Sequence, residues 1–175
     1  MRTFLISIAV LLFAGPAFAF QPDVSDELQL DVAKAILAIK KADPGIEAFF
    51  ENAAGYAVYP SVGKGGIVVG GAYGKGLVIV GGQVDGQTTM TQATVGFQLG
   101  GQKYALFIFF KDDAAIANFK RGNFEFGAQA SAVAATAGAS ADTSYDKGVA
   151  VLTHAAGGLM VEGSVGGQKF TYEPK

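Results

Sequence analysis

Residues 62–82 read VGKGGIVVGGAYGKGLVIVGG, and the reading of this stretch decides the fold. Nine of its 21 residues are glycine, and nearly all the others are aliphatic. Such a composition is found in phosphate-binding loops, in membrane-spanning segments and in closely packed β-sheets. Each of these three structures makes demands on particular positions, so the residues can be tested against them.

A phosphate-binding loop does not fit this stretch. The Walker A pattern needs a glycine five residues before its Gly-Lys pair and a Ser or Thr directly after it. Gly74-Lys75 has Val69 at the first of these positions and Gly76 at the second. The pair at 63–64 fails at the same two positions, and the dinucleotide pattern G-x-G-x-x-G lacks its last glycine from either start.

A membrane-spanning helix is also excluded, and a packed sheet remains. A spanning helix needs about 18 or more consecutive apolar residues, whereas Lys64 and Lys75 interrupt this run. Apolar residues occupy both odd and even positions in IVVGGAY and LVIVGG. This pattern favours strands that are covered on both faces, with glycines where backbones approach closely.

Short runs rich in Val, Ile, Phe and Tyr continue from Tyr56 to the C-terminus. They predict strands near 56–59, 66–73, 76–82, 88–99, 102–110, 124–135, 147–154, 157–165 and 168–172. The predicted connections are Gly74-Lys75, Asp85-Gly86, Gly100-Gly101, Ala155-Ala156 and Gly166-Gly167. Connections this short predict antiparallel hairpins, because a parallel crossover needs a dozen residues or more.

Helices are expected before the sheet and once within it. Ser25 is expected to cap a helix over 26–41. One face of that helix carries Leu28, Val32, Ala35, Ile36 and Ile39, and a second apolar stripe carries Leu30, Ala33 and Leu37, with Lys34 and Lys41 beside it. Asp43-Pro44 is expected to end this helix and to start another, with Pro44 at its first position and Gly55 after its end.

Residues 112–121 predict a third, short helix that Asp112 caps and Gly122 ends. The predicted fold is therefore α+β. Its core is mainly an antiparallel sheet, barrel-like or a sandwich, with two N-terminal helices and one short internal helix.

The first 19 residues have the pattern of a secretory signal peptide. Arg2 precedes an apolar run over 4–14, and Ala17-Phe18-Ala19 fits the small-x-small cleavage pattern. Residues 20–175 are then one mature domain, exported to the periplasm or the extracellular space. Without Arg2, the 13 basic residues become 12 against 15 acids, so the net charge changes from −2 to −3. That charge argues against nucleic acid as a partner.

Residues with catalytic chemistry are few. The chain has one histidine, His154, and no cysteine. A hydrolase would have to combine His154 with Ser140 or Ser144, and no G-x-S-x-G motif accompanies either serine. Asp112 and Asp113 are better explained by helix capping than by acid–base catalysis. The sequence therefore predicts no enzyme, no cofactor and no metal site.

Several blocks of sequence occur in a distinctive order: YAVYPSVGKGGIVVGGAYGKG, TVGFQLGGQKYALFIFF, FEFGAQASAVA, YDKGVAV and GGLMVEGSVGGQKFTY. In this order they resemble the SYLF domain family over roughly residues 30–172. SYLF domains bind lipids and are also described as actin regulators in fungal relatives. The chain departs from the eukaryotic members in its signal peptide, its lack of a partner domain and its acidic charge.

The resemblance implies a non-catalytic protein that binds phospholipid or a membrane surface. In the family, membrane contact is associated with an N-terminal amphipathic helix and basic residues. Here these correspond to the helix at 26–41, and the candidate lipid-binding residues are Lys34, Leu37, Lys40 and Lys41. Lys64 and Lys75, expected in turns, are secondary candidates for headgroup contact. Export argues against actin as a partner and favours peripheral association with a membrane.

A second hypothesis belongs to a different class of function. An exposed, glycine- and valine-rich sheet edge can pair with a strand of another chain. The protein would then be a structural or interaction module of the cell envelope that acts by strand addition or self-association.

Overall fold

The computed structural model describes residues 19–66, 69–95, 102–122, 133–134, 140, 144–155 and 168–175. The helical elements are α1 (Glu27–Ala42), the 3₁₀ helix η1 (Pro44–Ile46), α2 (Glu47–Asn52) and α3 (Asp113–Lys120). The strands are β1 (Gly55–Gly66), β2 (Val69–Val80), β3 (Gln83–Val95), β4 (Gln102–Phe110), β5 (Val133–Ala134), β6 (Val149–Ala155) and β7 (Gln168–Pro174). The predicted signal peptide up to residue 18, the predicted strand at 157–165, most of that at 124–135, and the connections at 100–101 and 166–167 lie outside the described residues.

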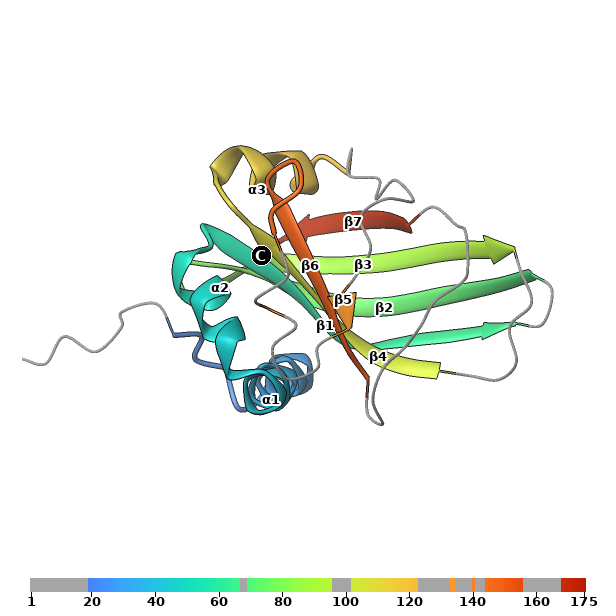
Figure 1. Ribbon diagram of the computed structural model, residues 1–175, viewed down its shortest axis with the longest axis horizontal. Coiled ribbons are helices and arrows are strands. Elements are labelled where there is room, and N and C mark those ends of the chain that lie inside the picture. The colour runs from blue at the N-terminus through green and yellow to red at the C-terminus, as the bar shows by residue number, and fades with distance from the viewer. Residues whose placement is uncertain are drawn as a thin grey trace, which may run out of the picture.

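All these strands belong to one sheet, in the order β5-β6-β4-β1-β2-β3-β7 (Figure 1). Every neighbouring pair is antiparallel except β5–β6. Within the described residues, α1, α2 and α3 accompany the sheet, so the predicted α+β class and mainly antiparallel sheet are confirmed. The order 4-1-2-3 of the first four strands is that of a Greek key.

Two predicted turns were wrong because the strands are longer than expected. Gly74, Lys75 and Gly76 lie inside β2, where they continue the pairing with β1 and β3. The prediction read the glycines as turn signals, but here they are strand positions. Asp85 and Gly86 likewise lie inside β3, at a bulge. The β2–β3 turn is made by Gly81 and Gly82, both with positive φ, which glycine adopts without steric cost.

The strand that follows β3 in sequence does not pair with it. A hairpin between the strands predicted at 88–99 and 102–110 was expected, whereas β4 pairs with β1 on one side and β6 on the other. β7 occupies the position beside β3 instead. Local connection length could not distinguish these alternatives, because strand pairing is decided by packing across the whole sheet.

The sheet is strongly curled. The ring centroids of Tyr59 in β1 and Phe170 in β7 are 5.8 Å apart, although β2 and β3 lie between their strands. In a flat sheet three strand spacings would separate them by about 14 Å. Phe119 of α3 packs on Phe110 of β4 at 5.0 Å and on Phe170 at 5.5 Å between ring centroids. α3 therefore covers the inner side of the curl between β4 and β7, and the core is barrel-like.

Both faces of the sheet are buried where the prediction expected it. The inner face contributes Ala57, Tyr59, Val78, Met90, Ile108 and Phe110 to one hydrophobic cluster that also includes α3. The outer face contributes Tyr56, Val58, Leu77, Ile79, Phe107 and Phe109 to a second cluster, beneath α1 and η1. Alternate residues of the same strands thus enter different cores, which explains why apolar residues occupy both the odd and the even positions of these strands.

α1 covers the outer face with the stripe that the periodicity predicted. Val32, Ala35, Ile36 and Ile39 are buried, whereas Leu37 of the second stripe is 69% exposed. The cap is Asp26 and not Ser25, because the Asp26 carboxylate accepts the Gln29 backbone N–H while Ser25 bonds to Asp23. Among the described helices, none combines the length and apolar character that crossing a membrane requires.

The other helix ends were predicted in part. Asp43 and Pro44 do separate two helical elements, but Pro44 begins the short η1, and α2 follows directly. The expected C-terminal role of Gly55 was wrong, since Ala53 ends α2 and Gly55 begins β1. In α3, the Asp112 cap and the positive φ of Gly122 are both confirmed.

Candidate functional site

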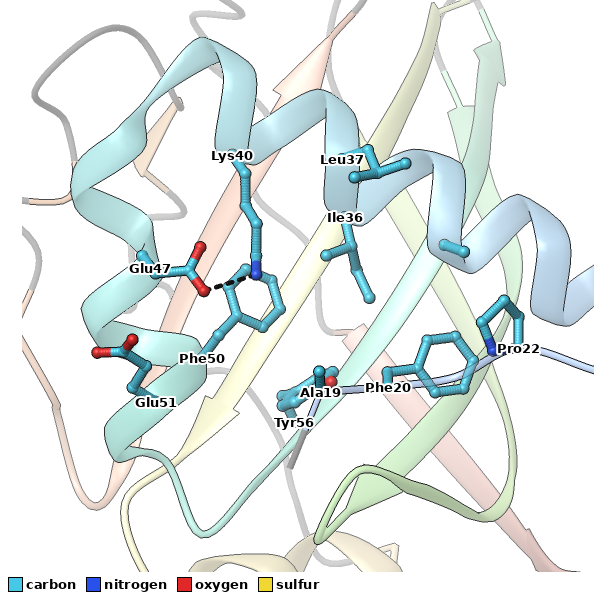
Figure 2. A pocket seen from close by; sticks show the side chains of 11 residues that line it. Ala19, Phe20, Pro22, Ile36, Leu37, Lys40, Glu47, Phe50, Glu51 and Tyr56 are labelled. Carbon is cyan, nitrogen blue, oxygen red and sulfur yellow. Dashed lines mark hydrogen bonds and ion pairs between the residues drawn. The ribbon is translucent and has the colours of Figure 1, made fainter. Parts of the chain in front are cut away.

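An apolar pocket lies between α1, α2 and the chain segment that precedes α1 (Figure 2). Its volume is about 480 Å³, within the range of about 300–1,000 Å³ typical of small-molecule sites. The lining consists of Ala19, Phe20, Pro22, Ala33, Ile36, Leu37, Lys40, Glu47, Phe50, Glu51 and Tyr56. Apolar and aromatic groups dominate this set, and its charged groups are Lys40 from the C-terminal end of α1 and Glu47 and Glu51 from α2.

The pocket exists because η1 turns the chain between α1 and α2. Asp43 caps η1 through the Gly45 backbone N–H at 3.1 Å, and its second carboxylate oxygen accepts the Ser140 backbone N–H at 2.7 Å. Asp43 is 1% exposed. This buried carboxylate therefore holds the α1–α2 corner and joins it to a residue almost 100 positions away in sequence.

Lys40 and Glu47 lie at one side of the pocket. The Lys40 ammonium is 2.8 Å from a Glu47 carboxylate oxygen and 4.8 Å from the centroid of the Phe50 ring. Figure 2 shows the Lys40 side chain extending from α1 toward α2, above Phe50. The ion pair and the cation–π contact together fix the position of this positive charge beside an apolar cavity.

Aromatic rings form the base of the site. The Phe50 ring packs against the rings of Tyr56 and Phe109 in T-shaped geometry, with centroid distances of 5.0 and 4.9 Å. Burial raises the pKa of Tyr56 to about 12, and the Glu47 carboxylate contributes to the rise. Burial also raises the pKa of Tyr172 to about 12, with hydrogen bonding and charge from Asp85 acting in the same direction.

Because the pKa values of these two tyrosines are raised in the folded state, we expect the protein to lose stability at alkaline pH. Below pH about 10 both the folded and the unfolded states keep their phenols protonated, so stability is unaffected. As the pH rises from about 10 toward 12, the unfolded state ionises while Tyr56 in the folded state stays neutral, and stability falls. We expect the melting temperature to decrease over this interval, and to decrease less steeply in Tyr56→Phe. Tyr73→Phe, at an exposed position, should retain the wild-type slope, and equal slopes in all three proteins would contradict the prediction.

The predicted lipid-binding residues of α1 lie on its solvent side. Leu37 lines the pocket and is largely exposed, and Lys34 and Lys41 are exposed on the same side of the helix. Lys34 forms an ion pair with Asp31 at 2.9 Å. The structure thus brings Leu37 and Lys40 together at the pocket. It leaves Lys41 exposed next to them and places Lys34 at a different hollow, on the other flank of α1.

Lys64 and Lys75 do not lie in turns, as the sequence suggested, but inside β1 and β2. They also face opposite sides of the sheet. Lys64 is 7% exposed and shares the inner face with Val62, whereas Lys75 is exposed on the outer face. Only Lys75 is therefore placed where a bulky ligand in solvent could reach it.

A second hollow of about 360 Å³ lies on the opposite flank of α1. It is lined by Asp31, Lys34, Ala35, Ala38, Pro60, Ser61, Lys103, Tyr104, Ala105 and His154. Ser140, one of the two serines considered with His154, donates its backbone N–H to Asp43 at the α1–α2 corner instead. Among the described residues, no group of three His, Cys, Asp or Glu side chains is arranged to hold a metal ion.

Comparison with protein families adds an independent finding. Residues 91–174 match the family model Ysc84, described as "Las17-binding protein actin regulator". The chain contains a Ysc84 (SYLF) domain. The resemblance noted from the sequence blocks is thus confirmed at the level of the family. A comparison with curated proteins finds no match. The matched residues run from the end of β3 through β4, α3, β5 and β6 to β7, so the pocket residues at 19–56 lie before them.

The sequence prediction missed most of the pocket. Ile36, Phe50 and Tyr56 were assigned to helix faces or to a strand, and Phe20 was not considered. Their convergence depends on the η1 corner and on the segment at 19–22 crossing beside α1, as Figure 2 shows. The sequence signal for the pocket was the second apolar stripe of α1. A helix with apolar residues on two sides is expected to contact an apolar surface or ligand on each side.

Proposed function

We propose that this Ysc84-domain protein is a non-catalytic lipid-binding protein that takes up a hydrocarbon chain between α1 and α2. The observation that carries the proposal is the pocket of about 480 Å³ with its apolar and aromatic lining. Burial of a methylene group contributes about 0.8 kcal/mol. A chain of several methylenes therefore supplies enough free energy to bind without a catalytic or metal centre.

Charge at the rim supports an amphipathic ligand. Lys40 lies beside the pocket, and Lys41 follows it on the exposed end of α1. Glu47 and Glu51 also line the rim, and Glu47 already pairs with Lys40 at 2.8 Å. A carboxylate or phosphate headgroup would therefore pair with Lys41 and share or displace the Lys40–Glu47 ion pair, while its chain enters between Ile36 and Phe50. Leu37 would cover the chain at the opening. This arrangement fits a fatty acid or a phospholipid better than a wholly apolar ligand.

The cellular setting follows from the expected signal peptide. The description of the matched family concerns a protein that binds Las17 and regulates actin. An exported protein does not meet the actin cytoskeleton, so we propose phospholipids of the cell envelope as the ligands. In this proposal the protein acts in the periplasm or outside the cell, at the periphery of a membrane.

Filling the pocket tests this function. Ala33 lines the pocket from α1, so Ala33→Phe places a ring where the hydrocarbon chain would lie. We expect the affinity for a soluble fluorescent fatty acid to fall by at least about tenfold, or roughly 1.4 kcal/mol. Ala117→Phe adds the same ring to an exposed position of α3 and should leave the affinity unchanged. Equal affinities in the wild type and both variants, or no uptake by the wild type, would contradict the proposal.

A further inference from the structure

The outer face of the sheet continues beyond α1 as an exposed surface. Lys75 and Tyr73 lie two and four residues before Leu77, which packs in the outer core, and they therefore point to the same side. Lys103 stands in the same relation to Ala105 of β4. Tyr73 is 50% exposed, and both lysines are exposed. The residues beyond the helices thus form an open continuation of the helix-covered face.

Strand register places the exposed side chains in rows. One row crosses five strands in the order Lys103, Gly63, Tyr73, Thr91 and Lys169. The adjacent row contains Ser61, Lys75, Thr89 and Thr171. We call these two rows the basic face.

Small residues leave the basic face accessible. Gly63 and Ser61 separate the lysines of β4 and β2, and threonines occupy the rows in β3. A Cβ added at Gly63 would have no neighbour within 4 Å, so the surface above this glycine is open. Tyr73 is the one large apolar side chain in the two rows. It stands centrally in its row, with a lysine at each end.

The charge of the basic face has one sign. Lys75, Lys103 and Lys169 lie in its two rows, and neither row contains a carboxylate. The nearest acid along β7 on this side is Glu173, which pairs with Gln87 in the next row. The whole chain has a net charge of −2. Three cations without an intervening acid therefore form a local positive field on an acidic protein.

The basic face adjoins the lipid-binding helix. The hollow of about 360 Å³ on the outer flank of α1 is lined by Lys34 from the helix and by Lys103 from the basic face. His154 lines the same hollow from β6. Asp31 also lines the hollow and pairs with Lys34 at 2.9 Å. The hollow therefore brings Lys103 of the basic face next to α1, on the flank opposite the pocket, and Lys34 adds no unpaired charge to it.

From this placement we propose that the basic face docks the protein on the headgroup layer of an anionic bilayer. Lysines near such a surface are attracted by its negative potential, and tyrosine is favoured at the membrane–water interface. The proposal rests on the proposed lipid-binding function and assigns contact with the membrane surface to a face of the protein that is separate from the pocket. The pocket binds one chain, whereas the basic face recognises the charge of many headgroups.

A bilayer fits the basic face better than a nucleic acid does. Both ligands offer phosphates, and a single strand could also stack a base on Tyr73. Nucleic-acid-binding domains, however, are usually strongly basic, whereas this chain has a sequence pI of about 5.3. Three lysines around one tyrosine suit weak, salt-sensitive contact with a surface that presents many equivalent headgroups.

Vesicle co-sedimentation of the full chain tests the proposal. The vesicles contain equal parts of phosphatidylglycerol and phosphatidylcholine, with pure phosphatidylcholine for comparison. The variant carries Lys75→Gln, Lys103→Gln and Lys169→Gln. Each lysine near an anionic surface strengthens binding by roughly fivefold, so we expect the triple variant to partition about a hundredfold more weakly onto anionic vesicles. Raising the salt concentration should weaken the wild type much more than the variant.

A matched control separates location from net charge. Lys111→Gln, Arg121→Gln and Lys147→Gln together remove the same charge from exposed positions outside the two rows. This control should pellet with anionic vesicles like the wild type. If both triple variants weaken equally, or if neither does, the basic face is not the docking surface. If the wild type does not bind vesicles but binds a single-stranded oligonucleotide, and the first variant loses that binding, the bilayer proposal is wrong and the basic face binds nucleic acid.

The two proposals fail in different ways. The basic-face variant should still take up the soluble fluorescent fatty acid, because its substitutions lie outside the pocket lining. Ala33→Phe should still pellet with anionic vesicles. A basic-face variant with normal vesicle binding, together with an Ala33→Phe variant that loses fatty-acid uptake, would reject the docking surface and leave the pocket function standing.

Discussion

Gly76→Ala is expected to destabilise the protein by about 3 kcal/mol, because the added methyl group has no space. β1 contains a bulge between Val58 and Ser61, and Gly76 of β2 lies opposite it. A Cβ at Gly76 would collide with the Val58 carbonyl oxygen and would stand 2.8 Å from the Tyr59 ring. The Val58 oxygen belongs to the backbone, so relieving the collision requires the two strands to separate.

Gly63→Ala is the matched control for this substitution. It lies in the same hairpin, and a Cβ there would meet nothing within 4 Å. We expect its stability to stay within about 0.5 kcal/mol of the wild type. Thermal unfolding measures both, and the Gly76→Ala melting temperature should fall by about 10 °C. Similar melting temperatures for the two variants would show that Gly76 is not required by close packing.

This contrast explains how much of the fold the glycine-rich stretch could reveal. Its composition correctly indicated a sheet that is buried on both faces, because apolar residues occur at both odd and even positions. It could not show which glycines are turns and which are packing positions. Gly81 and Gly82 form the turn, whereas Gly76 admits the Tyr59 ring and Gly63 lies open to solvent. The difference depends on the bulge at Pro60, which is fixed only once β1 and β2 have paired.

The helices were better predicted than the strand order for a related reason. Caps and apolar periodicity act within a few residues, so Asp112, Gly122 and the buried stripe of α1 could be identified from the sequence alone. The position of β4 beside β1 depends on the curl of the sheet, in which Tyr59 reaches Phe170. The pocket depends in turn on the corner between two correctly expected helices. Features that join distant segments were therefore the ones that local patterns missed.

Asp43→Ala is the second substitution expected to have a large effect, a loss of about 3 kcal/mol. The carboxylate is buried and accepts backbone N–H groups from Gly45 and Ser140 at 3.1 and 2.7 Å. Alanine leaves these donors without that acceptor, and each unsatisfied buried donor costs about 1–3 kcal/mol. Asp112→Ala removes an exposed helix cap of similar geometry, a 2.8 Å bond from the Ala115 N–H. That control should cost only about 1 kcal/mol.

The same substitution connects the fold to the pocket. Asp43 fixes the corner at which α1 gives way to η1, and the pocket lies between the helices on either side of that corner. A looser corner lets Lys40 and Phe50 move apart, so Asp43→Ala should weaken fatty-acid uptake at temperatures where the protein is still folded. Asp43→Asn keeps a carbonyl oxygen for one of the two donors and should fall between the alanine variant and the wild type in both stability and uptake. If Asp43→Ala lowers the melting temperature no more than Asp112→Ala does, the buried carboxylate does not hold the corner, and the pocket must be shaped by the aromatic contacts of Phe50 alone.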